Sequence, residues 1–543
     1  MLKELKPLPV SNSDITTIIN NDFLYIDKTK FVYDMIKVPS KYFLSRPRRF
    51  GKSTLLSTLN EVFRGKKELF KEQWIYNSKW SWQEYPIIRL DFSVARSTSL
   101  EVFIKNSLKK TAIQYNIFDE SQFKEEPYDI YFKNIILNLF NKFNETQVVV
   151  LIDEYDKPIL DAIDNIEEAK AKREILKGFY SVMKLMDANL RFVFLTGVTR
   201  FTKVGVFSGL NNLDDITMDS KFATVCGITQ EELESYCKDY IEPLAKLEQL
   251  SYTDCLLKIK KWYNGFRFSK NASTVYSPYS TLLLLQKQEF ANYWFSSGNP
   301  SFLIKLLIKN RYYLPELSST TVDPMLFDSF DIDRLNIKVL LLQTGYLTIA
   351  PTISNNIKHN DTQMREITIA PPNYEIAVSL QSYILQYIYD NESTISHSKT
   401  ILQNSLDAVD INSFKLLIRG LFAGIPYYWY TNNDIAHYEG FYCSIFYSFL
   451  VGGGYDVIVE DTTNKGRIDI TLIAQNNVYI FELKTTNKTR VFPDENKNTA
   501  LEQIKAKGYA QKYQTGTYDK IYLIGAEFSE DERNLVDFDY ECI

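Results

Sequence analysis

The sequence has little of the chemistry that marks a zinc-binding, secreted or membrane protein. It contains only three histidines, which argues against a histidine-based metal centre or catalytic triad. Its five cysteines are odd in number and scattered, with no C-x-x-C pair, which predicts reduced thiols and no zinc site. No apolar run reaches the roughly 18 residues that a membrane-spanning helix needs, and the start MLKELKPLPVSNSD lacks the apolar core of a signal peptide. We therefore expect a cytoplasmic protein without a membrane segment.

An excess of basic charge is also missing. The net charge is −5, so bulk charge does not make the whole molecule a nucleic-acid binder, and any basic binding face must be local. The hydrophobic fraction of 45% and the charged fraction of 24% are those of an ordinary globular protein. The 543 residues are enough for about three or four domains.

Residues 1–285 are predicted to form an α/β domain. Four short apolar runs are typical of buried strands. They are KYFLS (41–45), PIIRLDFS (86–93), QVVVLIDEYD (147–156) and RFVFLTGVTR (191–200). Helical patterns lie between them, including an apolar stripe that starts after Gly51. Strands that alternate with helices predict a parallel sheet with helices on both faces.

Residues 286–400 are predicted to form a helical middle domain. Its last helical pattern is followed by GYLTIA (345–350), a polar stretch SNNIKHNDTQ (354–363), and REITIAPP (365–372). Helices followed by a two-stranded hairpin suggest a small winged-helix-like module. A helical linker with an incidental hairpin is the alternative, and the sequence leaves both open.

Residues 401–543 are predicted to form a second α/β domain. A helix from Glu439 to Val451 precedes three strand-like runs, and a helix (499–513) and a final strand follow. The strand-like runs are YDVIVED, GRIDITLIA and VYIFELKT, and the final strand is KIYLIGAEF (520–528).

The stretch RPRRFGKS resembles a phosphate-binding loop of the form G-x-x-x-x-G-K-[ST], with Arg46 at the place of the first glycine. It follows a predicted strand and opens a predicted helix, so backbone N–H groups and the helix N-terminus can attract phosphate. Lys52 would reach the β- and γ-phosphates, and the Ser53 hydroxyl would ligate Mg²⁺.

Two further strand ends support a nucleotide site. Asp153 would hold the Mg²⁺, Glu154 would activate the attacking water as the catalytic base, and the Thr196 hydroxyl would sense the γ-phosphate. Ligands of open α/β sheets bind at the carboxyl ends of strands, where all three lie. The alternative is a chance G-K-S with an acidic residue that caps a core strand. The residues expected to bind the nucleotide are Arg48, Arg49, Phe50, Gly51, Lys52, Ser53, Thr54, Asp153 and Thr196.

The loop arginines and Arg200 have two interpretations each. Arg46, Arg48 and Arg49 could contact phosphates or a neighbouring carboxylate, or they could form a solvated basic loop. Arg200 could make a second phosphate contact or a structural salt bridge.

A second site is predicted near the C-terminus. Glu482 and Lys484 lie two residues apart on one predicted strand and so share a face, and a hairpin can bring Asp469 beside them. Two carboxylates suit Mg²⁺ or Mn²⁺, which would activate water for attack on a phosphodiester, while Lys484 positions that water or stabilises developing charge. Glu439 could add a metal ligand. A surface Glu–Lys ion pair is the alternative.

The charge of the surrounding segment is a constraint on that site. Residues 431–543 carry 11 Lys and Arg against 18 Asp and Glu, a net charge of −7, most of it in the tail 527–541. Phosphate binding would therefore need a metal or basic surface from elsewhere in the chain.

Together these motifs resemble a bacterial family that joins an AAA-ATPase-like domain to a C-terminal PD-(D/E)XK nuclease-superfamily domain, which has a restriction-endonuclease-like fold. The shared motifs are YIDKT (25–29), SRPRRFGKSTLLSTL (45–59), LDFS (90–93), LIDEYDKPI (151–159), LTGVTRF (195–201), WYNGFRF (262–268), YSPYS (276–280), YWFSSG (293–298), GRIDI and YIFELK. In this family the loop usually has the form R-P-R-R-F-G-K-S, so the missing glycine is a family trait.

The resemblance implies roles for particular residues. Lys52, Ser53 and Asp153 are similar to nucleotide and Mg²⁺ residues. Asp469, Glu482 and Lys484 are similar to the nuclease triad, with Glu439 as a helix carboxylate. Gln503 and Tyr509 match a Gln and Tyr of some relatives, although here they stand six residues apart.

Two functions from different classes follow. The first is an ATP-binding protein, an ATPase, coupled to a metal-dependent nuclease that acts on DNA or RNA. The second is a non-catalytic, ATP-dependent switch whose C-terminal domain docks nucleic acid or protein. The sequence leaves open which nucleic acid is bound and whether the chain forms a homo-oligomer.

Overall fold

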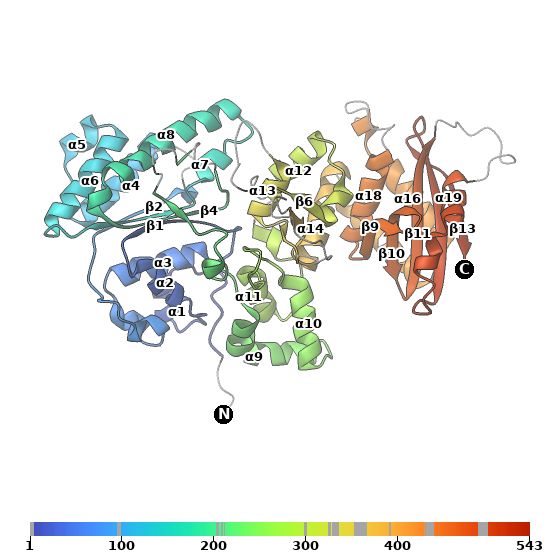
Figure 1. The fold of residues 1–543 in the computed structure, drawn as a ribbon, viewed down its shortest axis with the longest axis horizontal. Helices are drawn as coiled ribbons and strands as arrows, with labels where there is room; N and C mark the ends of the chain where they lie inside the picture. The colour runs from blue at the N-terminus through green and yellow to red at the C-terminus, as the bar shows by residue number, and fades with distance from the viewer. Residues whose placement is uncertain are drawn as a thin grey trace, which may run out of the picture. The chain divides into compact units, whose positions relative to one another are not determined.

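The computed structural model describes most of the chain, which forms two compact units (Figure 1). The described residues are 5–94, 99–201, 206–207, 210, 212–297, 301–323, 327, 336–351, 366–389, 392–427, 429–430, 439–486 and 498–543. The first unit comprises Met1–Gly298 and Thr321–Asn373, and the second comprises Asn299–Thr320 and Tyr374–Ile543. The chain therefore passes between the units three times. The domain boundaries predicted after residues 285 and 400 stay predictions.

The first unit is built on a parallel sheet of five strands in the order β2-β3-β4-β1-β5. The strands are β1 (Ser40–Ser45), β2 (Ile87–Asp91), β3 (Val148–Asp153), β4 (Leu190–Gly197) and β5 (Asp214–Asp215). β3 and β4 are buried along their whole length, as expected for central strands covered on both faces. The parallel sheet and its four predicted strands are confirmed. β5 was not predicted, because two aspartates carry no apolar pattern.

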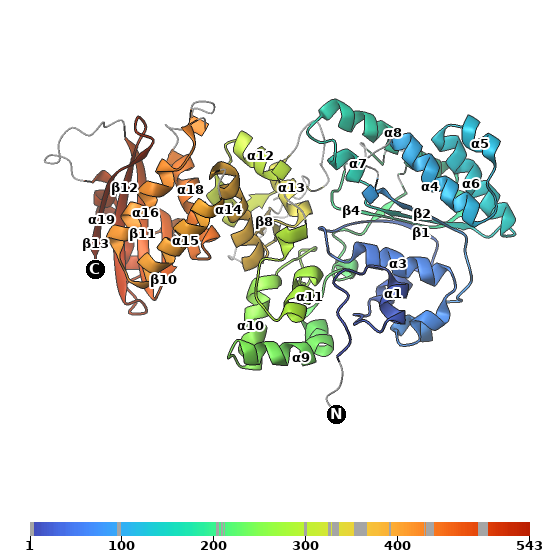
Figure 2. The same cartoon turned by 180° about the vertical axis from the view of Figure 1, so that it is seen from behind.

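Helices cover both faces of this sheet (Figures 1 and 2). On one face lie α1 (Ile15–Asn20), α2 (Thr29–Ile36) and α3 (Lys52–Phe63), and on the other lie α4 (Leu100–Gln114), α6 (Tyr128–Lys142) and α8 (Ile166–Leu185). α5 (Glu120–Glu125) and α7 (Lys157–Leu160) are shorter. The predicted apolar stripe of α3 is buried, including Leu56 and Leu59. This packing places the start of α3 at the carboxyl end of β1.

The rest of the first unit is helical with a small sheet. α9 (Gln230–Leu247), α10 (Tyr252–Tyr263) and α11 (Pro278–Lys287) pack around one apolar cluster. α9 begins with a capping box in which the Thr229 and Glu232 side chains bond to each other's backbone N–H. After α13 (Ile337–Thr344), β7 (Thr348–Ile349) pairs antiparallel with β8 (Ile367–Ala370), which is the predicted hairpin, and β6 (Thr320–Val322) adds a third strand. The polar stretch 354–363 lies outside the described residues.

The second unit carries a mixed sheet of five strands in the order β13-β12-β11-β10-β9. The strands are β9 (Asp456–Thr463), β10 (Gly466–Ala474), β11 (Asn477–Thr486), β12 (Lys520–Ser529) and β13 (Asn534–Cys542). β12 runs parallel to β11, and the other neighbours run antiparallel. The sequence predicted four of these strands, with β12 as the last strand of the domain 401–543. β13 was missed because its buried residues, Leu535 and Phe538, do not alternate and lie among acidic residues.

Helices pack on both faces of the second sheet. Phe414 of α16 (Ile411–Ala423) and Phe446 of α18 (Glu439–Gly452) contact Phe481 of β11. On the opposite face, α19 (Thr499–Lys507) buries Leu501 and Ile504 against the strands. The unit also contains α12 (Ser301–Lys309), the 3₁₀ helix η7 (Leu314–Ser318), α14 (Tyr374–Tyr389) and α15 (Glu392–Asp407).

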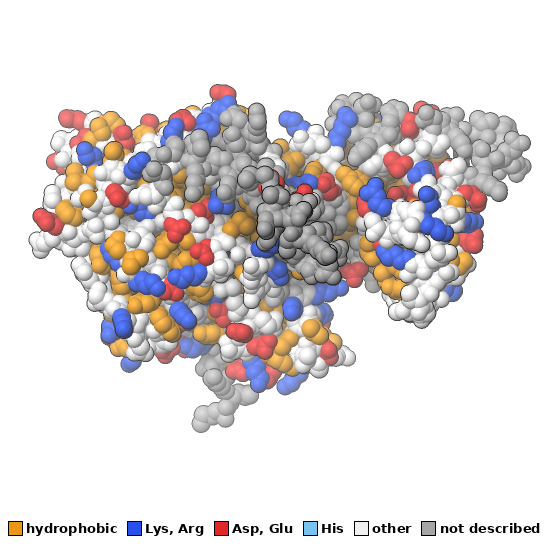
Figure 3. Space-filling view, viewed as in Figure 1, with side chains coloured by type: hydrophobic (Ala, Val, Ile, Leu, Met, Phe, Trp, Pro, Cys, Tyr) orange, Lys and Arg blue, Asp and Glu red, His pale blue; other side chains and the backbone are white. Residues whose placement is uncertain are grey.

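The distribution of charged side chains on the surface and the state of the cysteines are those expected from the composition. Acidic and basic side chains are interspersed over the face shown in Figure 3. All five cysteines belong to the described residues and are free thiols, four of them buried. In the described part of the chain, no helix is both long and apolar enough to cross a lipid bilayer.

Candidate functional site

The loop between β1 and α3 has the conformation that its glycine permits. Gly51 caps the N-terminus of α3 at φ 90°, a left-handed conformation that favours glycine. Arg49 also has a positive φ, of 61°. The Arg46 N–H donates to the Gly197 carbonyl at 3.1 Å, which fixes the loop to the end of β4. The N-terminus of α3 is thereby exposed at the carboxyl edge of the sheet.

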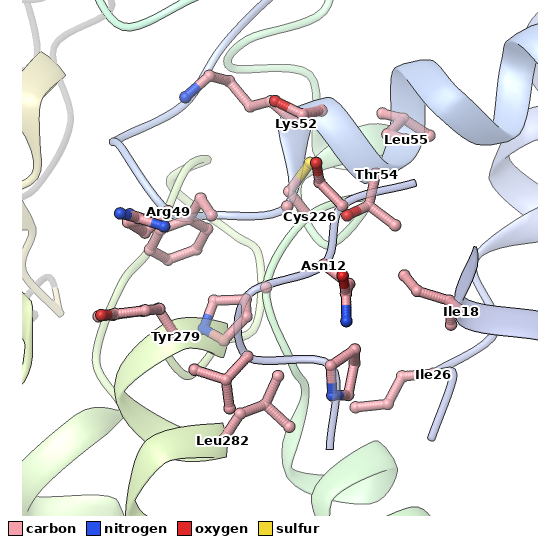
Figure 4. Close-up of a pocket in the computed structure, with 18 of the residues that line it drawn as sticks. Asn12, Ile18, Ile26, Arg49, Lys52, Thr54, Leu55, Cys226, Tyr279 and Leu282 are labelled. Atoms are coloured by element: carbon pink, nitrogen blue, oxygen red, sulfur yellow. The ribbon is translucent and has the colours of Figure 1, made fainter. Parts of the chain in front are cut away.

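A pocket of about 480 Å³ opens at this loop (Figure 4). Its loop side comprises Arg48, Arg49, Phe50, Gly51, Lys52, Ser53, Thr54 and Leu55, with Glu154 and Lys157 nearby. Seven of the nine predicted nucleotide-binding residues thus line one cavity. Figure 4 shows a polar end with Arg49 and Lys52 and an apolar end with Ile18 and Ile26.

The Lys52 side chain is folded onto its own loop. It is 4% exposed, and its Nζ donates to the carbonyls of Arg46 at 3.0 Å and Pro47 at 2.9 Å. The amine is thus occupied by carbonyls of its own loop, and a bound phosphate would have to replace these contacts.

Ser53 and Asp153 come together beneath the loop. Burial raises the pKa of Asp153, while a hydrogen bond with Ser53 and the charge of Lys52 oppose that shift. The next residue, Glu154, has φ 52°, and its N–H donates to Asp153 Oδ1 at 3.0 Å. A hydroxyl and a carboxylate are the oxygen ligands that Mg²⁺ takes at such sites, so this pair fits the ion.

Two predicted nucleotide residues, Thr196 and Phe50, have side chains buried in the core. The Thr196 hydroxyl is fully buried and donates to the Leu44 carbonyl at 2.9 Å, and Thr196 is not among the described residues that line the pocket. Phe50 borders the pocket but is itself buried. Its ring packs edge-to-face on Phe266 and Phe268, at centroid distances of 4.9 and 5.2 Å. Its contacts are those of a core residue that supports the loop.

Arg46 also has a structural position. It is 1% exposed, and its guanidinium donates to the carbonyls of Ser45 at 2.8 Å, Thr217 at 2.7 Å and Phe222 at 3.1 Å. The guanidinium lies 4.0 Å from the centre of the Phe268 ring, and its Nε has no partner in the described part of the chain. Burial lowers the pKa of Arg46 to about 10. None of the alternatives that the sequence left open describes these contacts, which are those of a buried anchor between the loop and neighbouring segments.

Arg200 likewise forms a salt bridge, with Asp215. Its backbone N–H donates to Gln343 Oε1 at 3.0 Å. The structural interpretation of Arg200 is therefore the one that its contacts support.

The apolar end of the pocket was not predicted from the sequence. It is formed by Pro9, Val10, Ile18, Leu24, Ile26, Pro278, Tyr279 and Leu282, and Cys226 lies alongside. The Arg49 guanidinium stacks over Tyr279, 4.8 Å from the ring centre. Tyr279 belongs to the YSPYS motif, which was the one feature of the sequence that could have assigned it to a site. The N-terminal residues 9–13 carry no pattern that would assign them to a site.

The second candidate site depends on the hairpin between β10 and β11. Gln475 and Asn476 both have positive φ, 49° and 59°, as a two-residue hairpin turn requires. The turn sets the register in which Ile470 lies opposite Phe481. Asp469 and Glu482 therefore occupy neighbouring positions on the two strands.

Glu482 is the most buried member of this site. It is 1% exposed, and its Oε1 accepts from Gln503 and pairs with Lys484 Nζ at 3.1 Å, while Oε2 has no partner among the described residues. Burial raises the pKa of Glu482 to about 7, and the charge of Asp469 adds to the shift.

Asp469, Lys484 and Glu439 lie close enough to affect one another electrostatically. Burial raises the pKa of Asp469 to about 6, although its Oδ2 accepts the Leu483 N–H at 2.8 Å. Burial alone would lower the pKa of Lys484, but Glu439 and Glu482 outweigh it and the pKa is raised. The structure thus brings together all four residues predicted for this site, with Glu439 at the start of α18.

Gln503 and Tyr509 also reach this site, despite their six-residue separation. α19 ends at Lys507 and is capped by Gly508, which has φ 61° and turns the chain. Gln503 contacts Glu482, and the Tyr509 hydroxyl donates to the Arg467 carbonyl at 2.9 Å. The turn at Gly508 explains why helical spacing alone did not place them together.

Three further residues of the site were not predicted. Glu460 of β9 forms a salt bridge with Arg467 at 2.8 Å, and its charge also acts on Asp469. Tyr313 and Cys443 lie 3.3 Å apart next to Glu460. Tyr313 comes from a segment with no motif, so only the fold reveals it.

The donor set of this site suits a divalent metal ion. The unpartnered, buried Oε2 of Glu482 is an oxygen that a cation would satisfy, and Asp469 supplies a second carboxylate. Within the described ranges, however, no three His, Cys, Asp or Glu side chains stand close enough to hold an ion as they are. A metal would therefore have to draw the Lys484 amine or a carboxylate from its present position.

The fold and the two sites define an α/β protein with a phosphate-loop-like pocket on its first sheet and a carboxylate–lysine centre on its second. A family model described as "Predicted AAA-ATPase" matches residues 9–207, and one described as "PD-(D/E)XK nuclease superfamily" matches residues 437–538. A protein of Azotobacter chroococcum mcd 1, described as "Uncharacterized protein in vnfD 5'region", is 36% identical over 548 residues, which cover 99% of each chain. The chain belongs to this family of AAA-ATPase-like proteins with a C-terminal PD-(D/E)XK nuclease-superfamily domain.

Proposed function

We propose that the chain binds and hydrolyses ATP at the pocket of its first unit. We also propose that it cleaves phosphodiester bonds of DNA or RNA at the carboxylate–lysine centre of its second unit. The proposal includes Mg²⁺ with the nucleotide and Mg²⁺ or Mn²⁺ at the second site. Its cytoplasmic location is inferred from the free, scattered cysteines.

The observation that carries the ATP proposal is the joining of a polar and an apolar end in one pocket. Lys52 and the N-terminus of α3 would receive the phosphates at the polar end. Tyr279 and Leu282 offer a flat apolar surface suited to a nucleobase. Glu154 lines the same pocket and would accept a proton from the attacking water.

The observation that carries the nuclease proposal is the unpartnered oxygen of buried Glu482 beside Asp469 and Lys484. A bound divalent ion would supply Lewis-acid activation of water and of the phosphodiester. Asp469 and Glu482 would hold that ion as carboxylates. Lys484, once released from Glu482, would donate to the charged oxygens that develop during cleavage.

One observation favours the non-catalytic switch as a second candidate. Lys484 and Gln503 already occupy Oε1 of Glu482, so one of the two oxygens of this carboxylate is taken by the protein's own side chains. A protein that keeps this pair would serve as a docking module under the control of ATP.

The test is a nuclease assay on purified full-length chain with single-stranded and double-stranded DNA and with RNA. The reactions contain Mg²⁺ or Mn²⁺, with and without ATP, and an ATPase assay runs alongside. Lys484→Ala and Asp469→Ala should each lower cleavage by about 100-fold or more, and Lys52→Ala should abolish ATP hydrolysis. Equal cutting by wild type and both centre variants would overturn the nuclease proposal. No cutting, with ATP binding intact, would favour the switch.

A further inference from the structure

A segment far upstream of the nuclease-family region folds as part of the second unit. Asn299–Thr320 belongs to that unit, although the family match begins only at residue 437. Leu314 and Leu317 of η7 are buried, and the Leu314 N–H donates to Ser444 Oγ of α18 at 3.1 Å. The segment is therefore anchored on the helix that carries Glu439.

The residue before η7 points to the carboxylates of the nuclease-like centre. The Tyr313 hydroxyl lies 3.3 Å from Cys443 Sγ and donates to Glu460 Oε1 at 3.3 Å. Asp469 is also among the charges that act on the Tyr313 phenol. A tyrosine from outside the family region thus lies next to residues of the centre.

Glu460 connects this tyrosine to the centre. The pairs Ile468↔Asp461 and Ile470↔Val459 place Glu460 across from Asp469, and φ 49° at Glu460 marks a local irregularity of β9. Two carboxylates directly opposite each other repel. The Tyr313 hydroxyl on Oε1 and Arg467 on Oε2 offset that repulsion and fix the orientation of Glu460.

We propose that Tyr313 is a positioning residue of the nuclease-like centre, whose hydroxyl holds Glu460 beside Asp469. This inference rests on the proposed metal-dependent chemistry of Asp469 and Glu482. Residues that hydrogen-bond to the carboxylates around a metal commonly set its affinity. Tyr313 also lies shortly before Thr320 and Thr321, where the chain passes to the nucleotide-binding unit. The centre is thereby linked through the backbone to one of the connections between the units.

The test compares Tyr313→Phe with Tyr312→Phe in the full-length chain. Both variants remove one hydroxyl from a half-buried ring, but the charge that acts on Tyr312 is that of Glu316, not of the centre. Tyr313→Phe should raise the Mn²⁺ concentration for half-maximal cleavage about 10-fold, with the rate at saturating Mn²⁺ largely retained. Tyr312→Phe should match the wild type.

Glu460→Gln provides a second measurement that does not depend on Tyr313. It should shift the Mn²⁺ dependence in the same direction, and adding Tyr313→Phe to it should have little further effect, because the two residues act through one contact. Calorimetric titration with Mn²⁺ alone should show the same shifts in affinity without any cleavage.

The outcomes separate this inference from the proposed function. If the wild type cleaves and Tyr313→Phe behaves like the wild type, the inference about Tyr313 is overturned and the proposed nuclease function stands. If Tyr313→Phe does not fold, an unchanged Mn²⁺ dependence in Glu460→Gln overturns the role in the same way. A wild type that neither cleaves nor binds Mn²⁺ overturns the proposed nuclease and the inference with it.

Discussion

In each unit the most buried charged side chain of the candidate site is 1% exposed, and the two are held in opposite ways. In the first unit, Arg46 is 1% exposed, stacks on Phe268 and donates to three backbone carbonyls. In the second unit, Glu482 is equally buried, but Lys484 and Gln503 share one of its oxygens and the other has no partner in the described chain.

This difference indicates that the charge of Arg46 stabilises the fold, whereas the charge of Glu482 belongs to a functional site. A buried ion with its hydrogen bonds made supports the surrounding structure, whereas one with an unmet oxygen weakens it. Unmet groups of this kind persist where a function needs them. Removing Arg46 and removing the charge of Glu482 should therefore change stability with opposite signs.

The largest expected effect is that of Arg46→Ala on the first unit. The variant removes the guanidinium donor from three backbone carbonyls, two of them in buried hydrogen bonds, and leaves a cavity beneath the loop, so the free energy of unfolding should fall by about 3–4 kcal/mol. Arg46→Lys should also lose stability, because an ammonium cannot reach the same carbonyls in the fork geometry of a guanidinium. Scanning calorimetry without nucleotide measures the change.

Arg48→Ala is the matched control, since Arg48 lies on the same loop and is exposed. It should stay within about 0.5 kcal/mol of the wild type. Equal stability of Arg46→Ala and Arg48→Ala would break the comparison, because Arg46 would then not be an anchor.

The second prediction is a smaller change in stability, and it is a gain: Glu482→Gln should stabilise the second unit. The folded state raises the pKa of Glu482 from 4.5 to about 7, mainly through burial. Between these pH values the folded chain holds a proton that the unfolded chain releases, so wild-type stability falls as pH rises through this window. Glu482→Gln removes that loss and should stabilise the second unit by about 2 kcal/mol at pH 8 without metal.

Urea denaturation at pH 4.5 and pH 8, with a chelator present, checks this prediction. At pH 4.5 the wild-type carboxyl is protonated in the folded state and resembles the amide, so the two proteins should agree. A Glu482→Gln variant that is less stable at pH 8 would show that the contacts with Lys484 and Gln503 outweigh the cost of burial.

The same contrast explains what the sequence could and could not predict. The phosphate loop is continuous in sequence, so its residues and the strand before it were read directly. The role of Arg46 could not be predicted in this way. Its guanidinium binds the carbonyls of Thr217 and Phe222, which are distant in sequence and carry no motif. The sequence also placed Thr196 at the γ-phosphate, whereas its hydroxyl bonds to the neighbouring strand.

The second centre was predicted only in part for a related reason. Asp469, Glu482 and Lys484 follow from strand alternation and a short hairpin. Glu460 depends on an irregular position in β9, and Tyr313 depends on how an upstream segment packs on α18. Local patterns therefore gave the residues on adjacent strands, and tertiary packing supplied the rest.

The smallest effect concerns an exposed charge, which should matter for binding and not for stability. Arg49 is exposed, stacks over Tyr279 and lines the pocket of the first unit. Arg49→Ala should weaken ATP binding about 3–5-fold, the range of an exposed cation–π contact, and leave the melting temperature unchanged. Tyr279→Phe keeps the ring face and should bind ATP like the wild type, whereas Tyr279→Leu should match Arg49→Ala. Isothermal titration measures all three. A large loss of stability in Arg49→Ala would instead place Arg49 with Arg46 as an anchor of the loop.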